Sequence, residues 1–121
     1  MSNWSRSLAG VQTLSEVSAS ASISSGTLTL DLSTAGVFYV SLNANITSLT
    51  ISNVQNVGSS AFTLIFTADG TPRAVTWGAS VLWPSGNAPS LTSTNGKKDV
   101  FSLITLDSGT NWYGFVGGQN L

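Results

Sequence analysis

The sequence contains neither cysteine nor histidine. Without cysteine the chain can form no disulfides or thiolate metal sites, and its redox compartment cannot be inferred. Without histidine it lacks the usual ligand of zinc, copper and non-haem iron, and the commonest general base at neutral pH. Catalytic triads and dyads that depend on either residue are therefore excluded, and we expect neither a metal nor a cofactor.

Charge is also scarce. Charged residues make up 7% of the 121 residues, whereas about a quarter is typical of soluble domains. The net charge of −1 provides no basic stripe for a phosphate backbone, so we expect no nucleic-acid partner. Weak self-repulsion favours association. No apolar run approaches the roughly 20 residues of a membrane span or the shorter core of a signal peptide, so no membrane partner is expected.

Carboxylates are the remaining candidates for catalysis, and the sequence places no two of them near each other as a glycosidase pair. Asp107-Ser108-Gly109 has the form of an aspartic-protease signature, but it falls too late in the chain for the flaps and second glycine turn of those enzymes. We interpret it as a β-turn. The prediction is that the protein is not an enzyme, with a small hydrolase that uses Asp107 as the remaining catalytic alternative.

What the sequence does contain is an alternation of apolar and polar residues. Residues 17–23 and 27–32 both alternate with period two, and Ser24-Ser25-Gly26 supplies a turn between them, which predicts an antiparallel hairpin. Turn-forming residues separate the later apolar runs. These runs predict further strands at 37–42, 49–51, 61–68, 74–77, 99–106 and 111–116.

Seven or eight short strands spaced about ten residues apart are typical of an all-β domain. We therefore predict a small antiparallel β-sandwich or jelly-roll-like domain over residues 17–121, with little helix because no stretch offers a capped amphipathic pattern. Residues 1–16 are less periodic and are predicted to form an N-terminal arm that orders against a neighbour. Its candidate assembly contacts are Trp4, Leu8 and Val11.

Aromatic residues supply the other candidate contacts. Trp77 and Trp83 flank a short apolar segment, and Tyr113 follows Trp112 near the end of the chain. Exposed aromatics stack on sugar rings and anchor protein interfaces. We name Trp77, Trp83 and Tyr113 as candidate exposed contacts, with packing in the core or in a subunit interface as the simpler alternative.

Several short motifs occur in a fixed order from about Gly26 to the end of the chain. They are Leu28-Thr29-Leu30-Asp31-Leu32-Ser33 leading into Val37-Phe38, Phe62-Thr63-Leu64-Ile65-Phe66 with Asp69-Gly70, Val75-Thr76-Trp77, Val81-Leu82-Trp83-Pro84 to Ala88-Pro89, and Trp112-Tyr113-Gly114-Phe115. In order and spacing the chain resembles a β-rich module of tailed-bacteriophage virion proteins, which include tail fibres and capsid-decorating proteins. The resemblance covers about four-fifths of the chain.

The resemblance implies a virion structural protein that works as a homotrimer or larger assembly. Since the module stands here without the long shaft of a fibre, we expect a capsid-decorating, or cement, protein that stabilises the capsid lattice. Its expected partners are its own copies and the major capsid protein or another virion protein, and its expected location is the virion, assembled in the host cytoplasm. The alternative is a tail-fibre or spike module that recognises glycans on the host surface.

Overall fold

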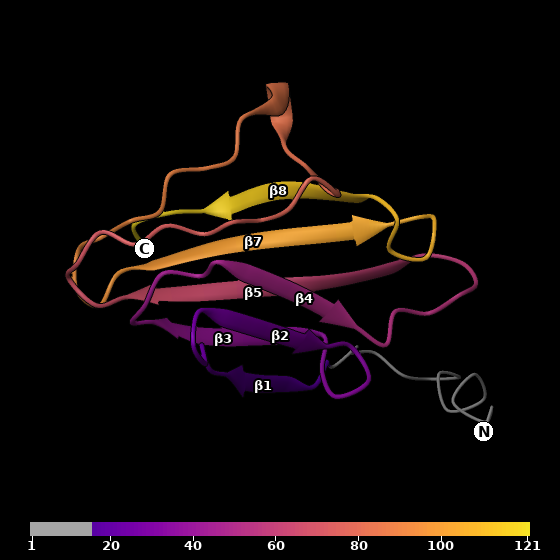
Figure 1. Ribbon diagram of the computed structural model, residues 1–121, viewed down its shortest axis with the longest axis horizontal. Coiled ribbons are helices and arrows are strands. Elements are labelled where there is room, and N and C mark those ends of the chain that lie inside the picture. The colour runs from indigo at the N-terminus through magenta and orange to yellow at the C-terminus, as the bar shows by residue number, and fades with distance from the viewer. Residues whose placement is uncertain (1–15) are drawn as a thin grey trace, which may run out of the picture.

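The computed structural model describes residues 16–121, which form an all-β domain, as predicted. Within these residues the chain forms eight strands and one short 3₁₀ turn, η1, and their arrangement can be followed in Figure 1. The elements are β1 (Ser18–Ala21), β2 (Thr27–Asp31), β3 (Val37–Leu42), β4 (Ser48–Ser52), β5 (Ser60–Ala68), β6 (Val81–Leu82), η1 (Pro84–Gly86), β7 (Lys98–Thr105) and β8 (Trp112–Gly118).

The first five strands wind as a coil between two sheets. β1, β3 and β5 are parallel neighbours in a six-stranded sheet, while β2 and β4 form a separate parallel pair. Each step along the chain therefore crosses to the other sheet, and strands two steps apart become neighbours. In Figure 1 the β2–β4 pair lies in front of β3. This coil explains why all the pairings in this part of the chain are parallel.

The predicted antiparallel hairpin between 17–23 and 27–32 is wrong. The turn itself is present, because Ser25 and Gly26 both have positive φ and the backbones of Ser24 and Thr27 exchange two hydrogen bonds of 2.9 Å. However, Ser24 and Thr27 form only an isolated bridge, and β2 continues into the second sheet. Alternation specifies which side of a strand is apolar, but it does not specify the strand's partner.

The second part of the chain completes the larger sheet mostly by antiparallel pairing. β7 pairs antiparallel with both β5 and β8, and the two-residue β6 pairs parallel with β8, giving the order β1-β3-β5-β7-β8-β6. The predicted strand at 74–77 is wrong, since only Val75 bridges to Ile46 and the strand forms later, at β6. The sheet is therefore mixed, whereas the sequence analysis expected antiparallel pairing throughout.

The hydrophobic core lies on one side of the six-stranded sheet. The β2–β4 pair covers one half of that side, with Leu28 and Leu30 completely buried. The connection 69–97 covers the other half through Trp77 and Trp83, whose rings both contact Phe101 of β7. This connection also carries η1, the projection at the top of Figure 1. The opposite side of the larger sheet has no covering element among residues 16–121.

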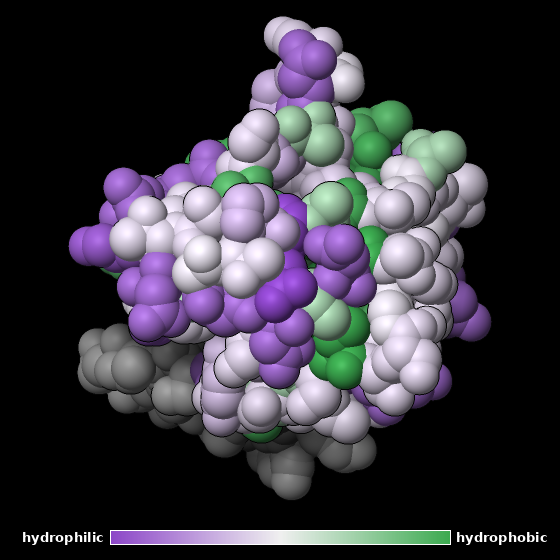
Figure 2. Space-filling view, turned by 60° about the vertical axis from the view of Figure 1, so that its left-hand side comes forward, coloured by the Kyte–Doolittle hydropathy of each residue, from purple (hydrophilic) through white to green (hydrophobic). Residues whose placement is uncertain are grey.

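The surface agrees with the low charge of the sequence. Figure 2 shows one side of the domain, where small polar residues in white and hydrophilic residues in purple surround limited green apolar patches. Among the residues described, the structure has no helix of the length and apolarity that would cross a membrane.

Candidate functional site

The outer side of the six-stranded sheet is the most extensive candidate contact surface. Along β5 the burial alternates, so that Phe62, Leu64 and Phe66 face the core while Thr63 and Ile65 face outward. The same alternation runs along β3, β7 and β8. We call this surface the open face. Its residues are Ser18, Ser20, Val37, Tyr39, Ser41, Ala61, Thr63, Ile65, Thr67, Leu82, Lys98, Val100, Ser102, Ile104, Tyr113 and Phe115.

The strand register arranges the open face into four rows that run across the strands. One row is polar, and Thr63 and Ser102 lie opposite each other on β5 and β7 in the next row but one. The remaining residues are mainly apolar, apart from Ser18 and Ser20 of β1 and the phenols of the two tyrosines. In strand order the rows are Ser41, Thr67 and Lys98; Ser20, Tyr39, Ile65 and Val100; Ser18, Val37, Thr63, Ser102 and Phe115; and Ala61, Ile104, Tyr113 and Leu82.

The open face exposes large apolar side chains, and its one charged residue is Lys98. The exposed fractions are 49% for Tyr39, 44% for Leu82, 41% for Tyr113 and 52% for Phe115. Lys98 lies at one end of the face, opposite Thr67. Contiguous apolar surface of this kind marks interaction sites in soluble proteins, whereas scattered single residues do not.

The edge of the same sheet is incompletely protected. β6 pairs with β8 only at Trp112 and Tyr113, so the outer edge of Gly114–Gly118 has no strand partner among the residues described. No charged residue or proline occurs in β8. Charged residues and prolines are the features that usually keep an edge strand from pairing with other chains. The edge therefore adds to the association tendency of the open face.

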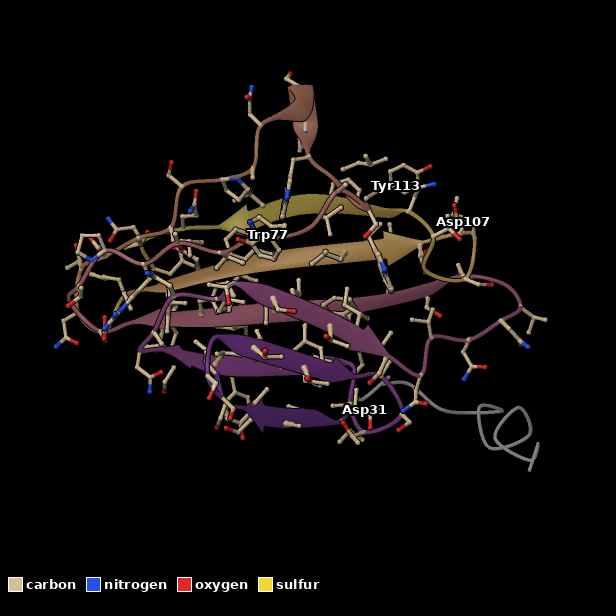
Figure 3. All side chains as sticks on the ribbon, in the orientation of Figure 1. Asp31, Trp77, Asp107 and Tyr113 are labelled. Carbon is tan, nitrogen blue, oxygen red and sulfur yellow. The ribbon has the colours of Figure 1, made fainter. Side chains whose placement is uncertain are left out.

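The predicted exposed contacts divide into one that is exposed and two that are buried. Tyr113 is exposed, whereas Trp77 and Trp83 are each only 8% exposed, so the assignment of these two as exposed contacts is wrong. The simpler alternative, packing in the core, is confirmed for them. The ring centroids of Trp77 and Trp83 lie 5.0 Å apart in an edge-to-face arrangement, and that of Trp77 lies 5.5 Å from Phe101. Figure 3 labels both Trp77 and Tyr113.

Gly114 explains how Trp83 is accommodated. A Cβ atom at Gly114 would lie 2.7 Å from two carbon atoms of the Trp83 ring, so only glycine allows this approach. Beside the ring is an open groove of about 590 Å³ lined mainly by apolar residues, including Trp77, Val81 and Leu82. The indole Nε1 of Trp83 is buried without a hydrogen-bond partner among residues 16–121. Because the rings of both tryptophans pack in the core, neither offers a free face for stacking on a sugar.

Three carboxylates hold turns through hydrogen bonds that they accept. Asp31 accepts from the Ser33 hydroxyl at 2.7 Å and from the Asn53 amide at 2.7 Å, and these bonds lower its pKa. The hydrogen bond from Arg73 lowers the pKa of Asp69. Hydrogen bonds from the backbone and side chain of Asn111 lower the pKa of Asp107. A general acid needs the opposite shift.

The Asp107-Ser108-Gly109 segment is a turn, as predicted. The N–H of Thr110 donates to the Asp107 carbonyl at 3.3 Å, and both Ser108 and Gly109 have positive φ. Thr105, a buried residue at the end of β7, donates its hydroxyl to the Asp107 carboxylate at 2.9 Å. Figure 3 shows Asp107 at this turn and Asp31 at a different one. These contacts give Asp107 a role in closing the β7–β8 connection.

Asp99 is the one carboxylate that is almost completely buried. Burial acts to raise its pKa, but hydrogen bonds from Thr92, Asn120 and Gln119 outweigh that effect, and its pKa lies below the ordinary value. The N–H groups of Thr92 and Asn120 donate to it at 2.8 and 3.0 Å. The ionised carboxylate therefore ties the 69–97 connection and the C-terminal residues to the start of β7.

Within the part of the chain that the structure describes, no three acidic side chains lie close enough together to hold a metal ion. The predicted assembly contacts Trp4, Leu8 and Val11 lie outside the described residues, as does the predicted arm apart from Glu16. No protein-family model, curated protein or solved structure matches the chain.

The sequence analysis missed most of the open face. Its signal was present in the strands that carry apolar residues on both sides of the alternation, such as Ile65 in β5 and Ile104 in β7. A strand that is covered on one side only usually has polar residues on the other. Two-sided apolar strands thus indicated either a second covering layer or an interface.

Proposed function

We propose that this chain is a structural protein of a tailed-bacteriophage virion, a capsid-decorating (cement) protein that binds and stabilises the capsid lattice as a homotrimer. Its partners in this proposal are its own copies and the major capsid protein or another virion protein. Its location is the virion, after assembly in the host cytoplasm. It catalyses no reaction and binds neither nucleic acid nor membrane. We class its two packed sheets as a small sandwich in which parallel pairs replace many of the antiparallel ones.

The observation that best supports an assembly role is the open face. A surface that exposes four large apolar side chains and carries a single charged residue is costly for a protein that works alone, because it promotes uncontrolled association. The same surface is favourable in a particle where other subunits cover it. The phage and capsid parts of the proposal are supported by the resemblance of residues 26–121 to virion modules.

Labelling of virions tests this function directly. Antibody raised against the whole chain, conjugated to gold, would be applied to purified virions from the source of the sequence. Regular labelling over the head is expected, and adding purified chain to heads that lack it should raise the temperature at which they rupture. Virions without any label would contradict the proposal.

A tail-fibre or spike module for glycan recognition is the second candidate, and the exposure of Tyr113 is the observation that favours it. The burial of Trp77 and Trp83 removes the two indoles that a sugar platform would use. This alternative predicts gold at the tail tip and binding of the isolated chain to a glycan array. Tyr113→Ala should then abolish array binding while Tyr39→Ala, a matched substitution elsewhere on the open face, retains it.

A further inference from the structure

We infer that copies of this chain contact one another edge to edge, with β1 of one copy paired parallel to β8 of the next. The inference rests on the homotrimer of the proposed function and identifies the contact that holds it, which that proposal leaves open. β1 and β8 lie toward opposite edges of the larger sheet, and their arrows point the same way in Figure 1. The occupant of each edge is a second copy of the chain.

The free edge of β8 begins where β6 ends. Trp112 donates its N–H to the Ser80 carbonyl at 2.8 Å, on the β6 side of the strand. Backbone groups in a strand point alternately to its two sides, so those of Gly114 and Val116 face the same way as those of Trp112. The C=O of Gly114 and the N–H and C=O of Val116 lie past the end of β6 and have no backbone partner among residues 16–121.

β1 offers matching groups on its outer side. The Val17 carbonyl accepts the N–H groups of Gly36 and Val37 at 2.9 and 3.2 Å, so the backbone groups of Val17 face β3. By the same alternation, the N–H and C=O groups of Ser18 and Ser20 point away from the sheet. No strand among residues 16–121 pairs with this side of β1.

The spacing of these groups selects parallel pairing. In a parallel ladder, one residue bonds to the two residues that flank its register partner. With Val116 opposite Ala19 of the next copy, the two flanking residues are Ser18 and Ser20. The N–H of Val116 then donates to the Ser18 carbonyl, and its C=O accepts from the Ser20 N–H. The Gly114 C=O accepts from the Ser18 N–H, so all three free groups of β8 are bonded.

The same pairing keeps the two sides of the sheet continuous between copies. In a parallel pair, register partners point to the same side, and both Val116 and Ala19 point to the core side. Antiparallel pairing through the same backbone groups would place Val116 beside Ser18 or Ser20, which point to the open face. The parallel arrangement is therefore the one that matches apolar side chains with apolar side chains.

Val116 and the β1 edge are also complementary in shape. Val116 pairs with the buried Phe101 on the core side of the sheet, yet its side chain is 45% exposed. At the other edge, an open groove of about 410 Å³ lies between β1 and β2. Its apolar lining is Ala19, Ala21 and Phe38, and the rest is polar. Pairing of β1 with β8 of the next copy places Val116 at this groove.

Head-to-tail pairing covers both edges of every copy. Because it joins two different edges, the contact is heterologous, and such contacts form rings when the rotation closes, as the proposed trimer requires. In a ring one side of the sheet faces the axis. The β2–β4 pair and the 69–97 connection occupy the other side, so the open face is the side with room to turn inward. A foreign strand, or β8 paired with its own copy, would leave the β1 edge open.

Chain length also favours a second copy. A pairing of about four residues on each strand is smaller than the roughly 800 Å² that each partner buries in a standard interface. The 15 residues that precede Glu16 join the fold next to β1, so every copy brings them to the same contact. A segment of that length can reach about 50 Å, which is enough to extend the contact onto the neighbouring copy.

Because the chain has no cysteine, two introduced thiols report the contact cleanly. In Ser18→Cys/Phe115→Cys the two thiols of one copy lie four strand spacings, about 19 Å, apart, which is too far for a disulfide. Pairing of β1 with β8 of the next copy brings them side by side. We expect mild oxidation to link chains, up to trimers, at least tenfold faster than in Thr50→Cys/Phe115→Cys, whose first thiol lies on the exposed side of β4.

Equal rates in the two double variants, or dimers of Phe115→Cys alone forming as fast, would overturn the inference. Adding Val116→Lys to the reporter pair brings a charge to the groove and should remove the difference. Ser20→Cys/Phe115→Cys reports the same contact in a register shifted by two residues. Circular dichroism spectra that match the parent chain establish that the variants fold.

The outcome is separable from that of virion labelling. Labelled heads without disulfide-linked chains reject this contact and retain the capsid function, whereas linked chains without labelled virions do the reverse. Linked species that extend beyond three chains support the edge contact and contradict the trimer.

Discussion

The two outer surfaces of this domain are built from the same strand alternation but differ in polarity. The outward residues of the β2–β4 pair, which we call the hydroxyl face, are Thr27, Thr29, Asp31, Ser48, Thr50 and Ser52. Those of the larger sheet, the open face, are mostly aromatic and aliphatic. Water can hydrogen-bond to every side chain of the hydroxyl face, whereas most of the open face gains by leaving water.

This difference shows which surface the low charge of the sequence affects. A surface of serine and threonine remains hydrated without any charged residue, so scarcity of charge alone does not require a partner. On the open face, where Lys98 is the one charged residue, the apolar side chains lack most of the charges that normally limit association. The two faces therefore differ in whether they need a covering subunit, and substitutions on each face and in the core test that difference.

The largest difference in stability is expected between substitutions on the two sides of a single strand, β7. Phe101 faces the core from β7 and is completely buried, while Ser102 faces outward on the open face. Phe101→Ala should lower the free energy of unfolding by about 3–5 kcal/mol because it leaves a cavity. Ser102→Ala should change it by less than about 0.5 kcal/mol. Urea denaturation of both variants measures the difference in free energy of unfolding. Equal losses in the two variants would contradict the prediction.

Asp99, on the inner side of β7, should make the free energy of unfolding depend on pH. Asp99→Ala removes the acceptor of the Thr92 and Asn120 N–H groups and should cost about 1–3 kcal/mol at neutral pH. Because the folded-state pKa is lowered, this stabilisation is present above the ordinary carboxyl pKa and is lost as pH falls through the folded value. Denaturation curves from pH 7 downward should show the gap between parent and variant closing below about pH 4. A gap that widens in acid would contradict the assignment.

Gly114 tests how tightly the inner side of β8 is packed. Gly114→Ala forces a Cβ against the Trp83 ring, which Trp77 and Phe101 hold in place, and overpacking of this kind costs about 1–3 kcal/mol. Gly86→Ala is a control for a Cβ added in open space, although the positive φ of Gly86 adds some strain. The melting temperature should fall more for Gly114→Ala. A larger fall for Gly86→Ala would show that the contact with Trp83 has been misjudged.

The smallest effect on folding should accompany the clearest effect on association. Tyr39→Lys on the open face and Thr29→Lys on the hydroxyl face both replace exposed side chains, so each should change stability by about 0.5 kcal/mol or less. Light scattering should show Tyr39→Lys shifted toward the monomer at concentrations where Thr29→Lys remains associated. Loss of association in Thr29→Lys alone would reverse the roles of the two faces.

The sequence was sufficient to predict most of the strands and turns, but not the strand at 81–82 and not which strands pair. Turn residues such as Ser25-Gly26 and Ser108-Gly109 mark their positions through local backbone preference, and both turns form. Pairing depends on where each turn directs the chain, so the alternation of Leu28 and Leu30 is compatible with either a hairpin or a coil. The assignment of Trp77 and Trp83 failed for a similar reason, because their burial depends on the path of the 69–97 connection over β7.

Sedimentation equilibrium of the unmodified chain tests the central claim, that this is an assembly protein, most directly. The account predicts a mass above the 12.5 kDa of one chain that rises with concentration toward three times that value. A mass of 12.5 kDa throughout the micromolar range would contradict it.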